Sequence, residues 1–193
     1  MSAFQIRISR RSFLQAAGLT ALAGGLAACG STAQSTAPSA SAPAYSLEDA
    51  VKAEFTDSGI TLSPENASGC TVEGTVLTIA AAGTYAVSGS CADGSIQIRK
   101  GTEDVTLVLN GLTLTSTTTA PLVCGKSSGV TLAAAEGTEN TLTDGEANNK
   151  DNANASEDAE SAVVKCKDGS QVVLCGTGTL NLHAVGKNGI KSG

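Results

Sequence analysis

The chain has 193 residues, and its 12 basic and 18 acidic side chains give a formal net charge of −6. This acidic balance argues against nucleic acid or an anionic membrane surface as a direct partner. One histidine and six cysteines without a CxxC spacing argue against a zinc site.

The first 28 residues predict an export signal. Arg10 and Arg11 precede an apolar run that ends in "LAAC", whose cysteine is Cys29. The run is too short and too often interrupted by glycine for a membrane-spanning helix, which needs about 20 apolar residues. The arginine pair resembles a twin-arginine motif and "LAAC" resembles a bacterial lipobox, so we expect Cys29 to carry a lipid. The alternative is an ordinary secretory peptide in which both motifs are coincidental.

Residues 29–46 are almost all Ser, Thr, Ala and Pro, a composition that cannot bury enough apolar surface to fold. We interpret them as a flexible tether between the lipid and the domain. The protein is then exported and anchored at the outer face of the cell membrane, on the extracellular or periplasmic side. Removal of residues 1–28 takes away three arginines and no acids, so 9 basic and 18 acidic side chains remain, a charge of −9. The membrane is therefore expected as a partner only through the lipid anchor.

Residues 47–193 are predicted to form the folded domain. Apolar residues alternate with polar ones along short runs bounded by Gly, Asn, Asp and Ser, as at Val105, Leu107 and Leu109. This period of two is typical of β-strands. The segment 46–55 fits either a capped helix or a strand, and the alternation of its apolar residues favours the strand.

The strand runs repeat along the chain. Residues 121–132 ("PLVCGKSSGVTL") align without gaps to residues 163–174 ("VVKCKDGSQVVL") at an offset of 42, which places Cys124 over Cys166. Upstream, "DVTL" aligns to "GVTL" at an offset of 25. The longer offset is explained by an insertion, residues 146–160, which is rich in Asn, Asp and Ala.

Repeats of this length with several short strands per unit predict an all-β solenoid, namely part of a right-handed parallel β-helix. Each unit would form one coil, and equivalent residues would lie about 4.8 Å apart in adjacent coils. An antiparallel β-sandwich is the alternative. It does not explain why turn residues match without gaps between units.

The order of "GTYAVSG", "DVTLVLNGLTL", "EGTENTLTDG", "GTGTLNL" and "NGIKS" resembles a family of secreted bacterial carbohydrate-binding β-helix proteins. Typical members contain calcium and bind polygalacturonate-like acidic polysaccharides. The resemblance covers residues 60–193 and implies non-catalytic binding of an acidic polysaccharide at the cell surface. A structural or adhesive solenoid without glycan binding is the alternative function. Family members continue with further coils after "GIKS", so the resemblance also implies that this chain is truncated or a fragment.

Calcium would let an acidic protein hold an acidic polysaccharide, because the ion can bridge carboxylates of both partners through hard oxygen ligands. Acidic residues bracket the insertion and the turn that follows it one coil later. The predicted metal ligands are Asp144, Asp158, Glu160 and Asp168. A disordered acidic loop is the alternative interpretation.

Catalysis is not predicted. Lys165 and Lys167 flank Cys166 and are expected to point outward near Asp168, where an acidic sugar could meet them, but solvated lysines on a β-face are the simpler interpretation. His183 is the single histidine, and it follows the alternation of Leu180 and Leu182 along its strand, so we interpret it as structural and not as part of a Ser/His/Asp set. A polysaccharide lyase is accordingly the least favoured function. The near absence of aromatic residues also argues against a stacking platform for neutral glycans.

Five cysteines remain after Cys29, and an odd number cannot pair completely within one chain. The aligned positions of Cys124 and Cys166 predict either a disulfide or two stacked thiols that pack as small apolar side chains. Cys70 and Cys91 are the other plausible pair.

Overall fold

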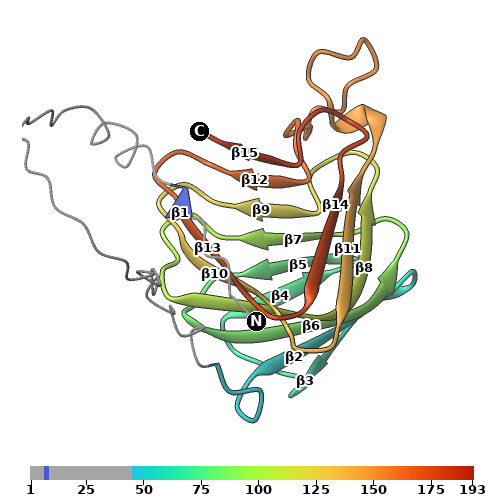
Figure 1. Ribbon diagram of the computed structural model, residues 1–193. Helices are drawn as coiled ribbons and strands as arrows, with labels where there is room; N and C mark the ends of the chain where they lie inside the picture. Colours follow the sequence, from blue (N-terminus) through green and yellow to red (C-terminus); the bar gives the residue numbers. More distant parts are fainter. Residues whose placement is uncertain (1–6, 9–44) are drawn as a thin grey trace, which may run out of the picture.

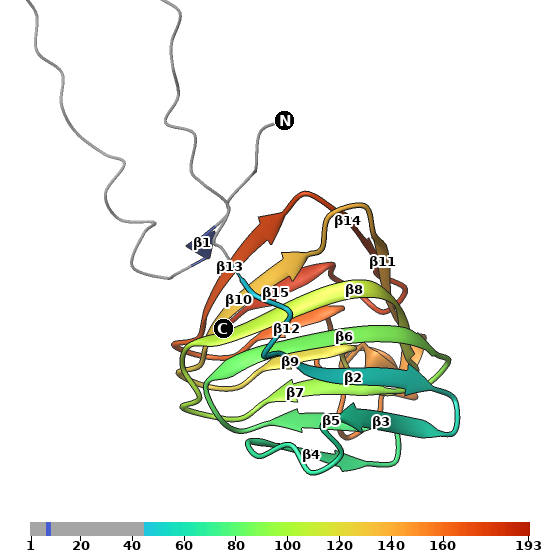
Figure 2. The same cartoon turned by 90° about the horizontal axis from the view of Figure 1, so that it is seen from below.

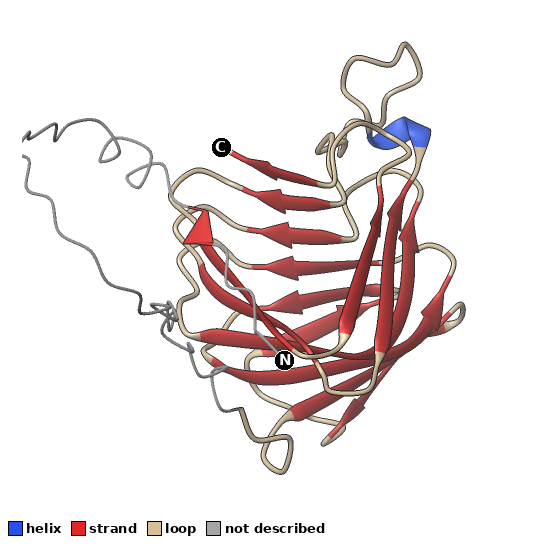
Figure 3. Ribbon diagram, in the orientation of Figure 1, coloured by secondary structure: helices blue, strands red, loops and turns tan. Residues whose placement is uncertain are grey.

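The computed structural model describes residues 7–8 and 45–193 (Figure 1). The predicted lipidation site Cys29, the export motif Arg10 and Arg11, and the tether up to residue 44 lie outside the described residues. The described part is all-β, as predicted, and its only helix is the short 3-10 helix η2 (Glu146–Asn148), shown in blue in Figure 3. In these residues there is no helix with the length and apolar character needed to cross a membrane.

The strands form a larger and a smaller sheet that face each other (Figure 2). The larger sheet contains, in order, β1 (Arg7–Ile8), β13 (Gln171–Gly176), β10 (Gly129–Ala134), β8 (Val105–Ser116), β6 (Gly83–Cys91), β2 (Val51–Thr56) and β3 (Gly59–Ser63), with β11 (Glu139–Asp144) paired to both β8 and β14 (Thr179–His183). The smaller sheet contains, in order, β15 (Ile190–Ser192), β12 (Val164–Cys166), β9 (Leu122–Cys124), β7 (Ser95–Ile98), β5 (Val76–Ile79) and β4 (Cys70–Glu73).

Parallel pairing dominates both sheets. Ten of the thirteen strand pairs in the described part are parallel, and the antiparallel ones are β1–β13, β2–β3 and β4–β5. From β7 onward the chain passes in turn through the smaller and the larger sheet, and each strand pairs with its equivalent from the preceding circuit. An antiparallel sandwich does not account for these parallel pairs.

The repeat predicted from the sequence is confirmed by the strand register. Val130 lies between Val105 and Val172, which reproduces the offsets of 25 and 42. Cys124 lies opposite Cys166. The segment left open between helix and strand contains the start of β2, so the strand interpretation is confirmed.

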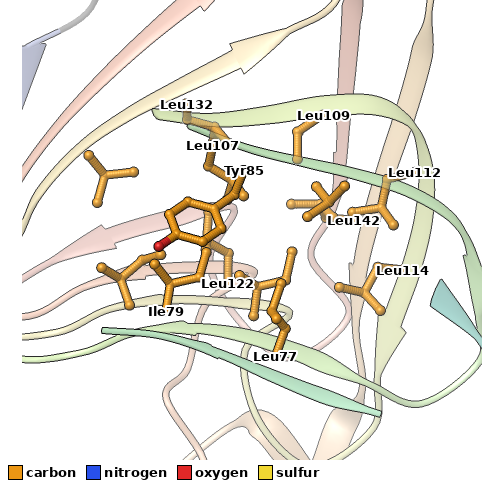
Figure 4. Close-up of a cluster of buried hydrophobic side chains, with 14 of the residues drawn as sticks. Leu77, Ile79, Tyr85, Leu107, Leu109, Leu112, Leu114, Leu122, Leu132 and Leu142 are labelled. Atoms are coloured by element: carbon orange, nitrogen blue, oxygen red, sulfur yellow. The ribbon is translucent and has the colours of Figure 1, made fainter. Parts of the chain in front are cut away.

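The core consists of apolar columns that run across the strands. Leu77, Ile96 and Leu122 follow one another on β5, β7 and β9. Leu107 and Leu132 pair on β8 and β10, and Figure 4 labels these two with Leu77 and Leu122. Each of these side chains is at most 1% exposed. Burial of one such side chain stabilises the fold by about 1.5–3 kcal/mol, so apolar residues at alternate positions favour the in-register stack.

A second, smaller apolar cluster lies apart from the core. It contains Val108, Ala133 and Cys175, and Tyr45 and Leu47 pack against it. Tyr45 was expected to belong to the tether. It instead packs against the domain, because its ring covers apolar side chains of the larger sheet that do not face the core.

Candidate functional site

A pocket of about 450 Å³ lies where β8, β10 and β13 begin. Thr106, Thr131 and Val173 line it side by side, in register across the three strands. Their side chains are half-buried, since the neighbouring positions along each strand point into the core. The pocket therefore opens on the outer face of the larger sheet.

Gly129 creates the space in the next row of the pocket. It lies opposite Gln171, and the backbone of Glu103 and Asp104 passes within 4 Å of the position that its Cβ would occupy. Because glycine has no side chain, the space between the Asp104 and Gln171 positions stays open. The backbone of Gly129 is not in the left-handed region, so its role here is to leave room.

The turns at the edge of the pocket are repeated one circuit apart. Ser127 (φ 56°) and Gly169 (φ 74°) occupy the left-handed region at aligned positions. The next residue of each turn donates a hydroxyl hydrogen bond to the carbonyl three residues earlier, at 2.8 Å for Ser128 and 2.6 Å for Ser170. The aligned serines thus build the turns and fix where the pocket lining lies.

The chemistry of the pocket is polar and anionic. It presents two carboxylates, from Glu103 and Asp104, together with threonine and serine hydroxyls and the amide of Gln171. None of the described residues that line it is aromatic or basic. Such a surface can hydrogen-bond the hydroxyls of a sugar or offer oxygen ligands to a hard cation, but it cannot stack on a sugar ring.

Asp144, predicted as a metal ligand, instead closes the end of β11. Its Oδ1 accepts hydrogen bonds from the backbone N–H of Val185 at 2.7 Å and of Gly186 at 2.9 Å, and its Oδ2 accepts one from Asn148 Nδ2 at 2.8 Å. The residue is 1% exposed. Three N–H groups bind its carboxylate and fix the loop between β14 and β15.

Asn148 anchors the insertion at its base. Its Nδ2 donates to Ala162 O at 2.9 Å, and its Oδ1 accepts from the backbone N–H of Glu160 at 2.6 Å. The asparagine is fully buried. Residues 146–160 are therefore an ordered loop with a fixed base, rather than the disordered acidic loop considered as the alternative.

The other predicted metal ligands do not share contacts of their carboxylates with Asp144 in the described part. The Glu160 carboxylate pairs with Lys167 Nζ at 2.6 Å, and Asp158 lies on the exposed part of the loop. Asp168 lies in the turn after β12, and its backbone carbonyl accepts a hydrogen bond from the N–H of Ser127 at 3.0 Å. Within residues 7–8 and 45–193, no three His, Cys, Asp or Glu side chains form a group that could hold a metal ion. The four acids thus do not assemble a calcium site in the described part.

The expectation of two solvated lysines beside Cys166 is wrong for Lys165. This residue is 8% exposed, and its Nζ donates to Gly193 O at 2.7 Å. Burial lowers the pKa of Lys165 below its ordinary value, and the positive charge of Lys191 acts in the same direction. His183 lies exposed at the end of β14.

The five described cysteines are free and buried, so neither of the two considered disulfides is formed. Cys124 and Cys166 stack across β9 and β12. A hydrogen bond to Cys166, together with burial, raises the pKa of Cys124 well above its ordinary value. The same hydrogen bond lowers the pKa of Cys166.

Sequence reasoning missed the pocket. Glu103 and Asp104 precede a strand and carry no motif of their own. The usable signal was the repeat itself, which aligns Gly129 with Asp104 at the offset of 25 and with Gln171 at the offset of 42. A glycine between two polar residues in adjacent circuits marks a gap on the outer face.

A family model and a curated relative carry the same description. Residues 73–193 match the model of a family described as "Carbohydrate-binding domain-containing protein". A protein of the same description from Acetivibrio thermocellus is 29% identical over 130 residues, which are 67% of this chain and 44% of that protein.

A solved structure, described as the polysaccharide lyase-like protein from C. thermocellum in a gadolinium derivative, superimposes with a TM-score of 0.61 at 26% identity. The match covers 74% of this chain and 56% of that structure. The chain thus spans about half the length of the relatives that it matches.

Proposed function

Because the chain belongs to the family of carbohydrate-binding domain-containing proteins, we propose that it binds a polysaccharide, without cleaving it, in the pocket at the start of β8, β10 and β13. The observation that carries this proposal is the gap at Gly129, between side chains that can hydrogen-bond sugar hydroxyls. A lipid at Cys29 would hold the pocket at the outer surface of the cell membrane. The fold proposed for the domain is a right-handed parallel β-helix, which the repeated parallel pairs support and which follows the usual handedness of parallel crossovers.

The proposed ligand is an acidic polysaccharide bridged by calcium. Calcium takes six to eight oxygen ligands, and the pocket offers the carboxylates of Glu103 and Asp104 with nearby hydroxyl and amide oxygens. Two carboxylates are few for a dedicated calcium site, so the sugar carboxylates would have to complete the shell. Calcium and polyuronate should therefore each bind weakly alone and strengthen each other's binding by the same factor.

The test is a variant that fills the gap. Gly129→Gln should block the pocket with little loss of stability, because the nearest atoms to the new Cβ would be 3.6 Å away. Thr113→Gln is the matched control, since it places the same side chain at an exposed position near the other end of β8. Retention on polygalacturonate is measured by affinity electrophoresis with calcium and with a chelator.

We expect calcium-dependent retention of the wild type and of Thr113→Gln, and at least a tenfold weaker affinity for Gly129→Gln. Equal affinity of the two variants would exclude this pocket as the site. No retention of the wild type on any polysaccharide would favour the alternative function, a structural or adhesive surface protein.

A polysaccharide lyase is the third candidate. It is tested because the structural neighbour is described as polysaccharide lyase-like. The described pocket lining has no histidine, lysine or arginine that could serve as the general base. Incubation with polygalacturonate and calcium should give no rise in the ultraviolet absorbance of unsaturated uronides. Such a rise would replace binding by catalysis as the function.

A further inference from the structure

Two lysines lie side by side on the outer face of the smaller sheet, on β12 and β15, which form one end of that sheet (Figure 1). Lys165 lies directly opposite Lys191 on these two parallel strands. The neighbours of Lys165 along β12, Val164 and Cys166, belong to the core, so the lysine side chain is on the outer face.

The third lysine, Lys150, comes from the insertion. The pKa of Lys165 is lowered by burial first, then by the positive charge of Lys191, and more weakly by that of Lys150, while Glu160 acts in the opposite direction. The backbone N–H of Lys150 donates to Ser161 Oγ at 3.0 Å, which holds this part of the insertion beside the segment that leads into β12. We call Lys150, Lys165 and Lys191 the lysine cluster.

The acids around the lysine cluster are already engaged. Glu160 forms an ion pair with Lys167 at 2.6 Å, and Asp151 forms one with Lys187. Within the described residues, neither Lys150 nor Lys191 forms an ion pair with a carboxylate. Like charges directly opposite each other on paired strands are destabilising. Asp151 interacts with the charge of Lys191, and Glu160 with that of Lys165, but both carboxylates form their ion pairs with other lysines. The positive charge of the cluster is thus only partly neutralised by its surroundings.

The ammonium groups of the cluster also have N–H donors left for a ligand. An ammonium group has three N–H donors, and Lys165 uses one of them on Gly193 O at 2.7 Å. Lys150 is exposed and Lys191 is half-buried. A ligand oxygen can thus reach charged donors from two strands and the insertion without entering the core.

We propose that the lysine cluster is a second binding site, which holds a carboxylate or sulfate group of a glycan by direct ion pairing and without calcium. The cluster goes beyond the proposed function, because the pocket at Gly129 offers carboxylates and the cluster offers ammonium groups. It would let an acidic protein hold an anionic polysaccharide through side chains that do not line the pocket. The glycan class follows from the family, and the anionic group follows from the local charge.

The test is carried out on the full chain in the presence of EDTA, which removes the calcium route. The probes are dextran sulfate and polygalacturonate, with neutral dextran as the uncharged polymer. The variant is Lys150→Gln combined with Lys191→Gln. The matched control is Lys52→Gln combined with Lys100→Gln, which removes two exposed lysines elsewhere on the surface.

We expect the wild type and the control to bind one or both charged polymers, with affinity that falls as salt rises, and not to bind neutral dextran. The cluster variant should bind about threefold to tenfold more weakly. Comparison of the two charged polymers decides between sulfate and carboxylate. Equal affinity of the two double variants, or no wild-type binding in EDTA, would overturn the proposal.

Two further measurements separate the possible failures. Thermal denaturation should give the cluster variant a midpoint at least equal to that of the wild type, because the change removes like charges, so a loss of binding cannot be ascribed to unfolding. Gly129→Gln should keep the EDTA-resistant binding in full. Loss of that binding in Gly129→Gln would assign the anion to the pocket and overturn the second site, whereas the calcium-dependent binding tests the proposed function separately.

Discussion

Asn140 holds the bend of β8 at Gly111. Its Oδ1 accepts hydrogen bonds from the backbone N–H of Gly111 at 2.9 Å and of Leu112 at 3.0 Å, and its Nδ2 donates to Thr179 O at 3.1 Å. Gly111 has φ 78°, in the left-handed region that favours glycine. One fully buried amide thus joins β8, β11 and β14, and the bend depends on a residue 29 positions away.

Replacement of Asn140 by alanine should cost about 2–4 kcal/mol of the free energy of unfolding, because the buried N–H of Leu112 and the part-buried N–H of Gly111 lose their acceptor and the buried site loses its amide. Asn181→Ala is the control, since the Asn181 amide makes one hydrogen bond, to Glu139 at 3.0 Å, on the exposed surface. Its cost should stay below about 0.5 kcal/mol. Urea denaturation of both variants measures the difference. Similar costs would show that Asn140 is not the support of the bend.

Asp144→Asn tests whether this acid is structural. The asparagine NH2 group would point a donor at one of the three N–H groups that now bind the carboxylate, so that hydrogen bond would be lost. We expect the free energy of unfolding to fall by about 1–3 kcal/mol. The loss should be the same with calcium and with EDTA, and calcium-dependent polysaccharide binding should persist. If calcium stabilised the wild type but not the variant, Asp144 would be a metal ligand after all.

Gly186→Ala tests the same contact from the other side. The new Cβ would lie 2.7 Å from Asp144 Oδ2 and 3.0 Å from Gly145 O, so the loop between β14 and β15 would have to move. We expect a lower urea midpoint than for Gly74→Ala, in which the new Cβ meets nothing within 4 Å. The control is strained by its own positive φ of 60°. A smaller effect at Gly186 would therefore contradict the close packing around Asp144.

The stacked cysteines should resist both oxidation and labelling. Cys124 and Cys166 are at most 2% exposed, and the pKa of Cys124 is raised well above its ordinary value by its hydrogen bond to Cys166 and by burial. Alkylation followed by peptide mapping should leave both unmodified in the native protein and modify both in urea without reductant. A peptide that links them and disappears on reduction would show a disulfide instead.

Lys165→Met should change how stability depends on pH. Burial lowers the pKa of Lys165 from its ordinary value of 10.5, so the folded chain releases this proton at a lower pH than the unfolded chain does. Between the lowered value and 10.5 the unfolded state binds more protons, and the wild type therefore gains stability as pH rises. Urea denaturation from pH 7.5 to 10.5 should show the free energy of unfolding of the wild type rising relative to that of the variant. A constant or opposite difference would contradict the lowered pKa.

Much of the architecture could be predicted because the same kind of residue recurs in every circuit. Apolar side chains at alternate positions stack on their equivalents, so the alignment of Val130 with Val105 and Val172 already contained the register. The bend at Gly111 was harder to predict. Its partner, Asn140, lies opposite Leu180 in the next circuit, so the repeat gives no sign of an amide there.

The candidate site was less predictable for a related reason. Asp144 had the features of a metal ligand, but its partners are two backbone N–H groups and one amide, and backbone donors leave no mark in a sequence. The pocket depends on a missing side chain at Gly129, which becomes informative only beside its neighbours in adjacent circuits. Acidic residues close in the chain were therefore a weaker guide than residues aligned by the repeat.

The anchored base of the insertion has a consequence for how the protein can change over generations. Asn148 binds Asp144 on one side and Ala162 on the other, so both ends of the loop are fixed to the domain independently of what lies between them. Substitutions and length changes in residues 152–157, beyond the Asp151–Lys187 ion pair, are thus separated from the folding of the strands. This segment can diversify under selection, or accept a foreign peptide, while the scaffold that displays it is inherited intact.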